Sequence, residues 1–198
     1  MNEDQDQHFR KGRVMDNGAS SYCRFLKGEK DAIVEIVSEY NNGLVLFLNS
    51  ITGDICLSEE LAEDIFCELL LTKPKYNGKS SFKTWLYAIA RFHAYRLLKR
   101  RKRFVNSPVD ELYELADKEN LENSYIKNEQ KIQLHRALGK INPEYSQVLY
   151  LTYFEGFSNS EAAKILDKNN RQIENLIYRA KQALKAQLEK EGFVYEKL

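Results

Sequence analysis

The residues best suited to chemistry lie near the C-terminal end of the chain, on a long helix expected to open at Asn169. Guanidinium, ammonium and carboxamide groups can donate hydrogen bonds to phosphates and to base edges in the major groove. The side chains with these groups on the outer side of that helix are Arg171, Gln172, Asn175, Arg179 and Lys181. This combination indicates a DNA-binding surface, and the alternative is a helical hairpin with a solvated charged face.

A second group suited to nucleic acid lies in the middle of the chain. Residues 99–103 are all Lys or Arg, which is more cations than a helix end needs to offset its dipole. Tyr87, Arg91 and Tyr95 precede this run, on the side of the same helix opposite its apolar face. Aromatic rings offer a surface for an unstacked base, and cations attract phosphates. A solvated helix end is again the alternative.

Catalytic or metal-binding sites are not evident in the sequence. The three cysteines include no C-x-x-C pair, and the three histidines are scattered. There is no glycine-rich phosphate loop, and no serine or cysteine has a nearby base. We therefore expect no enzymatic activity, no metal and no cofactor.

Helices must position these groups, because Leu, Glu, Lys, Ala and Arg are abundant while the 198 residues include only three prolines and nine glycines. Apolar residues recur every three or four positions from Ile33 to Ile51 and from Leu61 to Leu69, which predicts two helices. Ser58 is expected to cap the second. A loop over residues 73–81 then leads into the helix that begins at Phe82.

Two capping boxes predict a helix-turn-helix motif. Ser158 and Glu161 have the spacing at which each side chain satisfies a free backbone amide of the other, and Asn169 and Gln172 repeat this spacing. A turn of about three residues joins the two helices. In this motif the second helix enters the major groove of DNA.

Charged residues are unevenly distributed along the chain, with a basic run at 99–103 followed by an acidic stretch, although the formal net charge is only +1. We predict an all-α protein of two small helical domains. The expected segments are a disordered tail over 1–24, a domain over 25–103, a flexible acidic linker over 104–126, a domain over 127–190 and a tail over 191–198. The sequence contains no run of about twenty apolar residues. We therefore expect a soluble, cytoplasmic protein without membrane insertion.

Two stretches of the chain resemble the extracytoplasmic-function sigma factors, bacterial transcription initiation factors that retain conserved regions two and four. LAEDIFCE at 61–68, SFKTWLYAIAR at 81–91 and the basic run resemble region two. INPEY at 141–145, YFEGFS at 153–158, EAA at 161–163 and YRAK at 178–181 resemble region four.

The resemblance implies that the first domain binds core RNA polymerase and opens the minus-10 element, and that the second binds the minus-35 element. The residues expected to bind polymerase are Glu63, Asp64 and Glu68. Those expected at minus-10 DNA are Asn77, Lys79, Ser80, Tyr87, Arg91, Tyr95, Arg100 and Arg101. Those expected at minus-35 DNA are Arg171, Gln172, Asn175, Tyr178, Arg179 and Lys181. The implied partners are core polymerase and promoter DNA, and an anti-sigma factor is left open.

The chain departs from the family pattern at several of these surfaces. Cys67 replaces the usual Gln, Phe92 replaces Asn, Arg96 replaces Asp, Asp167 replaces Gly, and Glu174 stands where Lys or Arg is common. Contacts at these positions are therefore not carried over. The alternative function is a stand-alone helix-turn-helix regulator that never associates with polymerase.

Overall fold

The computed structural model describes residues 16–105 and 129–192, and every regular element in these ranges is a helix. The N-terminal part contains α2 (Asn17–Leu26), α3 (Ala32–Thr52), α4 (Ile55–Thr72) and α5 (Phe82–Val105). The C-terminal part contains α7 (Glu129–Lys140), α8 (Pro143–Leu149), the π-helix η1 (Tyr150–Phe154), α9 (Asn159–Leu166) and α10 (Asn170–Lys190). The all-α prediction is therefore confirmed for the described residues.

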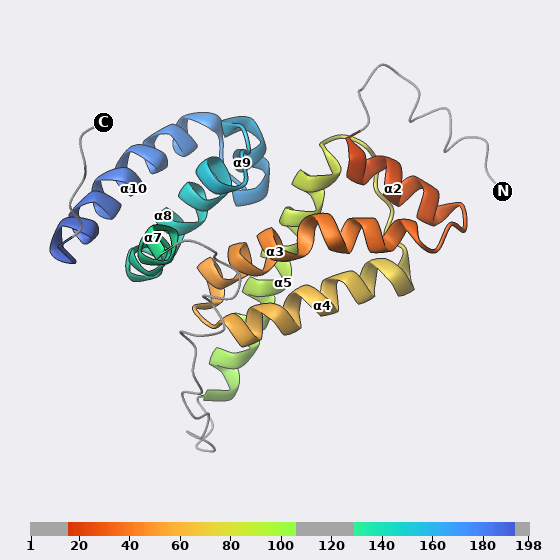
Figure 1. Cartoon of the computed structure of the whole chain (residues 1–198), viewed down its shortest axis with the longest axis horizontal. Helices are drawn as coiled ribbons and strands as arrows, with labels where there is room; N and C mark the ends of the chain where they lie inside the picture. The colour runs from red at the N-terminus through yellow and green to blue at the C-terminus, as the bar shows by residue number, and fades with distance from the viewer. Residues whose placement is uncertain (1–15, 106–128, 193–198) are drawn as a thin grey trace.

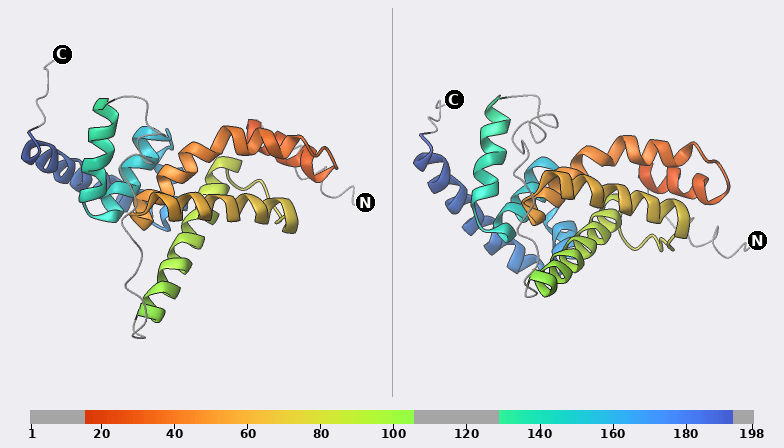
Figure 2. Two further views of the ribbon diagram at one scale, coloured as in Figure 1. Left: turned by 60° about the horizontal axis from the view of Figure 1, so that its bottom comes forward. Right: turned by 90° about the horizontal axis from the view of Figure 1, so that it is seen from below.

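Helix α3 is the central element of the N-terminal part. Its apolar stripe, which includes Leu44, Phe47 and Leu48, is fully buried, as the periodicity of the sequence predicts. Helices α2, α4 and α5 all pack against it. Helix α4 runs alongside α3, whereas α5 crosses the pair and its C-terminal end projects from the body (Figures 1 and 2). The basic run at the end of α5 is thereby held away from the core.

The predicted tail over 1–24 is wrong for residues 17–24, which belong to helix α2. Tyr22 and Phe25 of α2 are buried, and the Tyr22 ring lies 5.3 Å from Phe82 and 5.6 Å from Trp85, measured between ring centroids. Asp16 caps α2 by accepting a hydrogen bond from the Ala19 amide at 2.7 Å. Residues 1–15 lie outside the described part of the chain.

The start of α4 also differs from the prediction. Asp54 is the N-cap, and its side chain accepts a hydrogen bond from the Leu57 amide at 3.3 Å. Ser58 lies one turn inside the helix, where it is buried and its hydroxyl donates to the Asp54 carbonyl at 2.7 Å. Both residues can cap a helix, and the turn that Gly53 makes in the left-handed region, at φ 66°, selects the earlier one.

The helix-turn-helix is confirmed as the sequence predicts it. Both capping boxes are formed, by Ser158 with Glu161 at the start of α9 and by Asn169 with Gln172 at the start of α10. Asp167 ends α9 at φ 54°, in the left-handed region where glycine is favoured. This conformation gives a physical reason for the glycine that the sigma-factor pattern has at this position.

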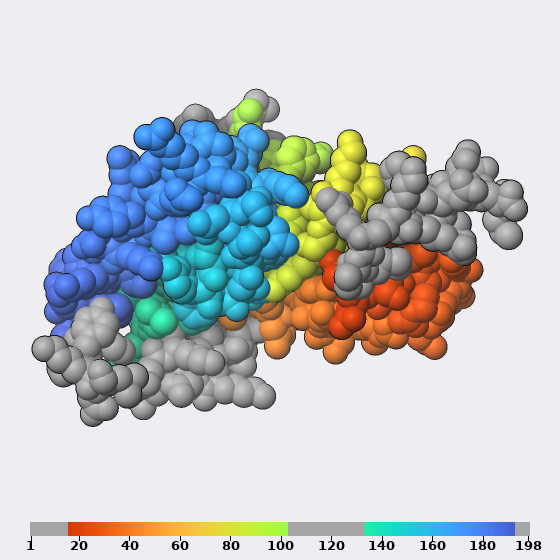
Figure 3. Space-filling model, turned by 90° about the horizontal axis from the view of Figure 1, so that it is seen from above, coloured from red at the N-terminus to blue at the C-terminus, as the bar shows by residue number. Residues whose placement is uncertain are grey.

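The two parts of the chain pack directly against each other. Helices α8 and η1 contact α3, and α9 contacts α5, so that one apolar core runs through both parts. In the space-filling view α9 lies against the yellow start of α5 (Figure 3). Most of the predicted linker over 104–126 lies outside the described residues, as do residues 193–198 of the predicted C-terminal tail. The division into two domains therefore stays a prediction.

Candidate nucleic-acid interface

Helix α10 presents one face to the core and the other to solvent. Ile173, Leu176 and Ala180 are buried. The six side chains predicted to contact minus-35 DNA are all exposed: Arg171, Gln172, Asn175, Tyr178, Arg179 and Lys181. An exposed row of cations, amides and one phenol has the donors needed for phosphates and base edges.

Sequence reasoning missed one residue that adjoins this face. Tyr153 of η1 is exposed, and the Lys181 ammonium nitrogen lies 4.9 Å from the centroid of its ring. A cation over an aromatic face is attracted by the negative ring surface. Tyr153 therefore restrains Lys181 within the exposed row of α10. Helical periodicity does not predict this pair, because Tyr153 and Lys181 come from different helices.

The predicted polymerase-binding residues lie along the outer side of α4. Glu63 and Asp64 are exposed, and Leu71 further along the helix is 78% exposed. Glu68 has a partner within the chain, since its carboxylate oxygen lies 3.2 Å from the His93 Nε2 of α5. Of these three acids, Glu63 and Asp64 are exposed, whereas Glu68 also links α4 to α5.

The loop between α4 and α5 is anchored by Tyr76. Its buried ring packs 5.3 Å from Trp85 and 5.7 Å from Phe82 between centroids, and its hydroxyl donates to the Ser80 carbonyl. The predicted DNA contacts Asn77 and Lys79 stand exposed between these anchor points, as expected for a loop that presents its tip to a ligand.

Helix α5 carries the remaining residues predicted at minus-10 DNA. Arg100 and Arg101 are exposed at its projecting end. The Arg91 guanidinium lies 4.8 Å from the centroid of the Tyr95 ring. The Tyr95 hydroxyl accepts a hydrogen bond from the Gln147 side chain of α8 at 3.1 Å. The middle of α5 is thus already in contact with the C-terminal part.

The expectation that Tyr87 lies on an exposed face is wrong, because Tyr87 is 0% exposed. Its hydroxyl donates to the Glu155 carboxylate at 2.7 Å, and its ring lies 5.0 Å from Phe157 between centroids. Burial, together with the charge of Glu155, raises the pKa of Tyr87 well above its usual value. Periodicity placed Tyr87 opposite the apolar face of α5, but it gave no sign that a second part of the chain covers that side.

Lys83 completes a polar cluster with Tyr87 and Glu155. Its ammonium nitrogen lies 2.8 Å from the Glu155 carboxylate and donates to the Glu155 carbonyl at 2.7 Å. The same nitrogen lies 4.8 Å from the centroid of the Phe157 ring. A charged pair at an interface is stabilising when hydrogen bonds also satisfy it, as they do here.

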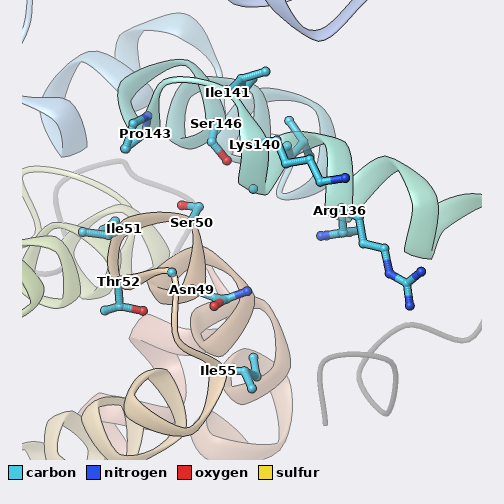
Figure 4. Close-up of a pocket in the computed structure, with 14 residues that line it drawn as sticks. Asn49, Ser50, Ile51, Thr52, Ile55, Arg136, Lys140, Ile141, Pro143 and Ser146 are labelled. Atoms are coloured by element: carbon cyan, nitrogen blue, oxygen red, sulfur yellow. The ribbon is translucent and has the colours of Figure 1, made fainter. Parts of the chain in front are cut away.

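A cavity of about 420 Å³ separates the α3–α4 turn from the α7–α8 turn (Figure 4). Asn49, Ser50 and Ile51 line one wall, and Leu138 and Ile141 line the other. Its lining also includes the polar side chains of His135, Arg136 and Lys140. The cavity marks a place where the contact between the two parts of the chain is incomplete.

Two further features bear on the kind of site present. Within residues 16–105 and 129–192, no group of three or more His, Cys, Asp or Glu side chains is arranged to hold a metal ion. Among the same residues, no helix has the length and apolar character needed to cross a membrane.

Comparison with known proteins matches both parts of the chain. The family models for Sigma-70 region 2 and for Sigma-70, region 4 match residues 36–104 and 131–184. The RNA polymerase sigma factor YlaC of Bacillus subtilis is 25% identical over 169 residues, which cover 81% of this chain and 94% of that protein. The ECF RNA polymerase sigma factor SigM of the same organism is 27% identical over 154 residues, which cover 78% and 93%.

Two solved structures share the fold. CnrH in complex with the cytosolic domain of CnrY has a TM-score of 0.64 at 19% identity, covering 88% of this chain and 99% of that chain. The sigma factor RpoE in complex with the anti-sigma factor NepR from Bartonella quintana has a TM-score of 0.62 at 18% identity, covering 80% and 98%.

Proposed function

Because the chain belongs to the sigma-70 family, as a sigma factor of the extracytoplasmic-function type, we propose that separate surfaces of it bind polymerase and the two promoter elements. Helix α4 binds core RNA polymerase, the loop at 73–81 and α5 hold the separated minus-10 strand, and α10 reads the minus-35 element. The observation that carries the proposal is the capped helix-turn-helix with six DNA-suited side chains exposed on α10.

The minus-35 assignment rests on the geometry of the motif. In a helix-turn-helix the second helix lies in the major groove, and its exposed side faces the base edges. Arg171 and Arg179 can each make paired hydrogen bonds to guanine or contact a phosphate. A base-specific pair contributes about 1 to 3 kcal/mol of discrimination. A change at a base-reading residue should therefore relax preference at one promoter position, whereas loss of a phosphate contact should weaken binding to all sequences alike.

The polymerase assignment rests on exposed acids. Glu63 and Asp64 face solvent on α4, where they are free to pair with cations of a partner. The chain itself then needs no catalytic group or cofactor, since polymerase performs the chemistry, and the place of action is the cytoplasm. The relatives whose structures contain CnrY or NepR make an anti-sigma factor a candidate partner of this chain as well.

The test is a quantitative binding assay with purified core polymerase, followed by transcription from promoter fragments. The double variant Glu63→Lys, Asp64→Lys should weaken binding to core polymerase while leaving the unfolding temperature unchanged, because both side chains are exposed. The matched control Glu174→Lys reverses an exposed acid on α10 and should bind core polymerase as tightly as wild type. Unchanged affinity in the double variant would refute the α4 assignment. Failure of the wild-type chain to bind core polymerase would instead favour a stand-alone regulator.

A further inference from the structure

The loop between α4 and α5 is attached to helix α2 near both of its ends. Where the loop begins, the hydroxyl of the buried Tyr22 of α2 donates a hydrogen bond to the Pro74 carbonyl at 2.7 Å. Where the loop ends, the Asp16 carboxylate that caps α2 accepts the amide of Phe82 at 2.7 Å. In Figure 1 the yellow trace that joins α4 to α5 runs beside α2. One short helix therefore holds the two points between which the tip of the loop lies.

The first residue of the loop makes a third contact with α2. Lys73 ends α4 at φ 47°, in the left-handed region that residues other than glycine rarely adopt. Such a conformation persists only where the surroundings fix it. The Lys73 ammonium nitrogen lies 5.1 Å from the centroid of the Phe25 ring of α2, an attractive cation–π distance. Helix α2 thus also contacts the residue at which the chain leaves α4.

The interior of the loop packs on the same aromatic rings as α2. Tyr22 lies 5.3 Å from Phe82 and 5.6 Å from Trp85, measured between ring centroids. Tyr76 of the loop lies 5.7 Å and 5.3 Å from the same two rings. Aromatic pairs at these distances attract one another. Tyr22 and Tyr76 therefore share one cluster, through which a shift of α2 reaches the ring that anchors the loop.

The Tyr22 hydroxyl is suited to hold the start of the loop. Burial raises the pKa of Tyr22 to about 12, so the hydroxyl stays protonated at neutral pH and can donate. Its acceptor, the Pro74 carbonyl, lies between the end of α4 and the start of α5, outside the hydrogen-bond ladder of either helix. The position of this carbonyl therefore depends on a side chain of α2.

We propose that helix α2 positions the loop at residues 73–81 for binding of the minus-10 strand, with Tyr22 and Asp16 as its positioning residues. Helix α2 precedes residues 36–104, which match Sigma-70 region 2. Its contacts hold the backbone on either side of Asn77 and Lys79 before a strand arrives. Such preorganisation strengthens binding, because less conformational freedom is lost when the ligand binds. The effect on DNA rests on the proposed function, whereas the holding of the loop rests only on the contacts above.

The test uses the full chain with one contact removed at each end of the loop. Tyr22→Phe keeps the ring in the aromatic cluster and removes only the hydroxyl that reaches Pro74. Asp16→Asn acts at the other end, where an NH₂ group would face the Phe82 amide in place of the acceptor oxygen.

The matched control is Tyr40→Phe. It also removes the hydroxyl of a buried tyrosine whose ring contacts Phe82, at 5.9 Å between centroids. The Tyr40 hydroxyl lies beside Gly18 rather than at the loop. Any effect that comes from general destabilisation should therefore appear in Tyr40→Phe as well, and thermal unfolding of each variant records how large that destabilisation is.

Two measurements separate the position of the loop from its use. Trp85 is the only tryptophan of the chain and contacts both Tyr22 and Tyr76, so quenching of its fluorescence by acrylamide reports how well the free chain holds the loop. Strand binding is measured by fluorescence anisotropy of a dye-labelled, single-stranded oligonucleotide of mixed sequence. The chain is bound to core polymerase in this assay, and core polymerase alone gives the background.

We expect Tyr22→Phe to raise the quenching constant of Trp85 and to weaken binding of the single strand by about two- to tenfold, since one hydrogen bond changes an equilibrium constant by about this factor. Asp16→Asn should change both quantities in the same direction. Tyr40→Phe should match wild type in both, even where its Tm falls. All three variants should bind core polymerase as tightly as wild type, because the exposed acids of α4 are unchanged.

Wild-type quenching in both Tyr22→Phe and Asp16→Asn would overturn the holding of the loop by α2. Increased quenching with wild-type strand affinity would overturn the positioning role, and so would an equal loss of strand affinity in Tyr40→Phe. If the wild-type complex bound the single strand no more tightly than core polymerase alone, the proposed function of the loop would be wrong. The Trp85 measurements would still decide whether α2 holds the loop.

Discussion

One carboxylate, that of Asp16, joins two helices that lie far apart in the sequence. One of its oxygens accepts the Ala19 amide at 2.7 Å and caps α2. The other accepts the amide of Phe82, the first residue of α5, also at 2.7 Å. The change Asp16→Ala leaves both amides without this acceptor. A lost helix cap costs about 1 kcal/mol, so we expect the free energy of unfolding to fall by about 2 kcal/mol.

The expected signal is large enough to measure by thermal unfolding followed with far-UV circular dichroism. For a chain of this size, about 1 kcal/mol corresponds to roughly 2 to 4 °C in Tm. Asp16→Ala should therefore lower Tm by about 4 to 8 °C. Asp16→Asn keeps the acceptor for the Ala19 amide but turns an NH₂ group toward the Phe82 amide. Its loss in Tm should therefore be about half the loss in Asp16→Ala.

The matched control is Asp31→Ala. Asp31 occupies the N-cap position of α3 but makes no side-chain capping hydrogen bond. Its removal should change the free energy of unfolding by no more than about 0.5 kcal/mol. Equal Tm losses in Asp16→Ala and Asp31→Ala would show that the double cap contributes nothing, and the reasoning would be wrong.

Three further changes follow from the packing. Gly18→Ala should destabilise the chain by about 1 to 3 kcal/mol in denaturant unfolding, because the new Cβ would lie 2.5 Å from the Tyr40 hydroxyl and 2.6 Å from the Phe82 ring; wild-type stability would show that α2 can shift. Asp167→Gly should raise the free energy of unfolding by up to about 1 kcal/mol, since it relieves a positive φ, and a loss would contradict this. Burial opposes ionisation of Glu161, but hydrogen bonds from Ser158, Ser81 and Thr84 lower its pKa below 4.5. The contribution of ionised Glu161 to the free energy of unfolding is present above 4.5 and is lost as the pH falls through the lowered pKa. The free energy of unfolding of Thr84→Val should therefore fall less steeply with decreasing pH in this range than the free energy of unfolding of wild type.

Local signals predicted the C-terminal motif well. Ser158 with Glu161 and Asn169 with Gln172 satisfy amides within four residues of sequence, so nothing distant is needed to form either capping box. The exposure of all six predicted minus-35 residues on α10 follows from the same helical period. Their roles in binding DNA stay predictions.

Distant partners account for what the sequence did not predict. Helix α2 has ten residues, and its stability depends on Tyr22 packing against Phe82, sixty positions later. Asp16 binds the Phe82 amide across a similar distance. Tyr87 is hidden by Glu155 and Phe157, from the opposite part of the chain. Hydrophobic periodicity describes one face of one helix at a time. It gives no information about a helix such as α5, which is covered on two sides by different neighbours.

The contacts that Glu155 makes with α5 depend on the number of residues in the π-helix η1. The Glu155 amide donates to the carbonyl of Tyr150, five residues earlier and at 3.1 Å, so the turn contains one residue more than an α-turn. An in-frame deletion of a single codon in this turn would restore α-helical spacing and rotate the following residues by about 100°. Glu155 would then point away from Lys83 and Tyr87. The loss of one residue would thus break the contacts of Glu155 with α5 while the sequence of α10 stays unchanged.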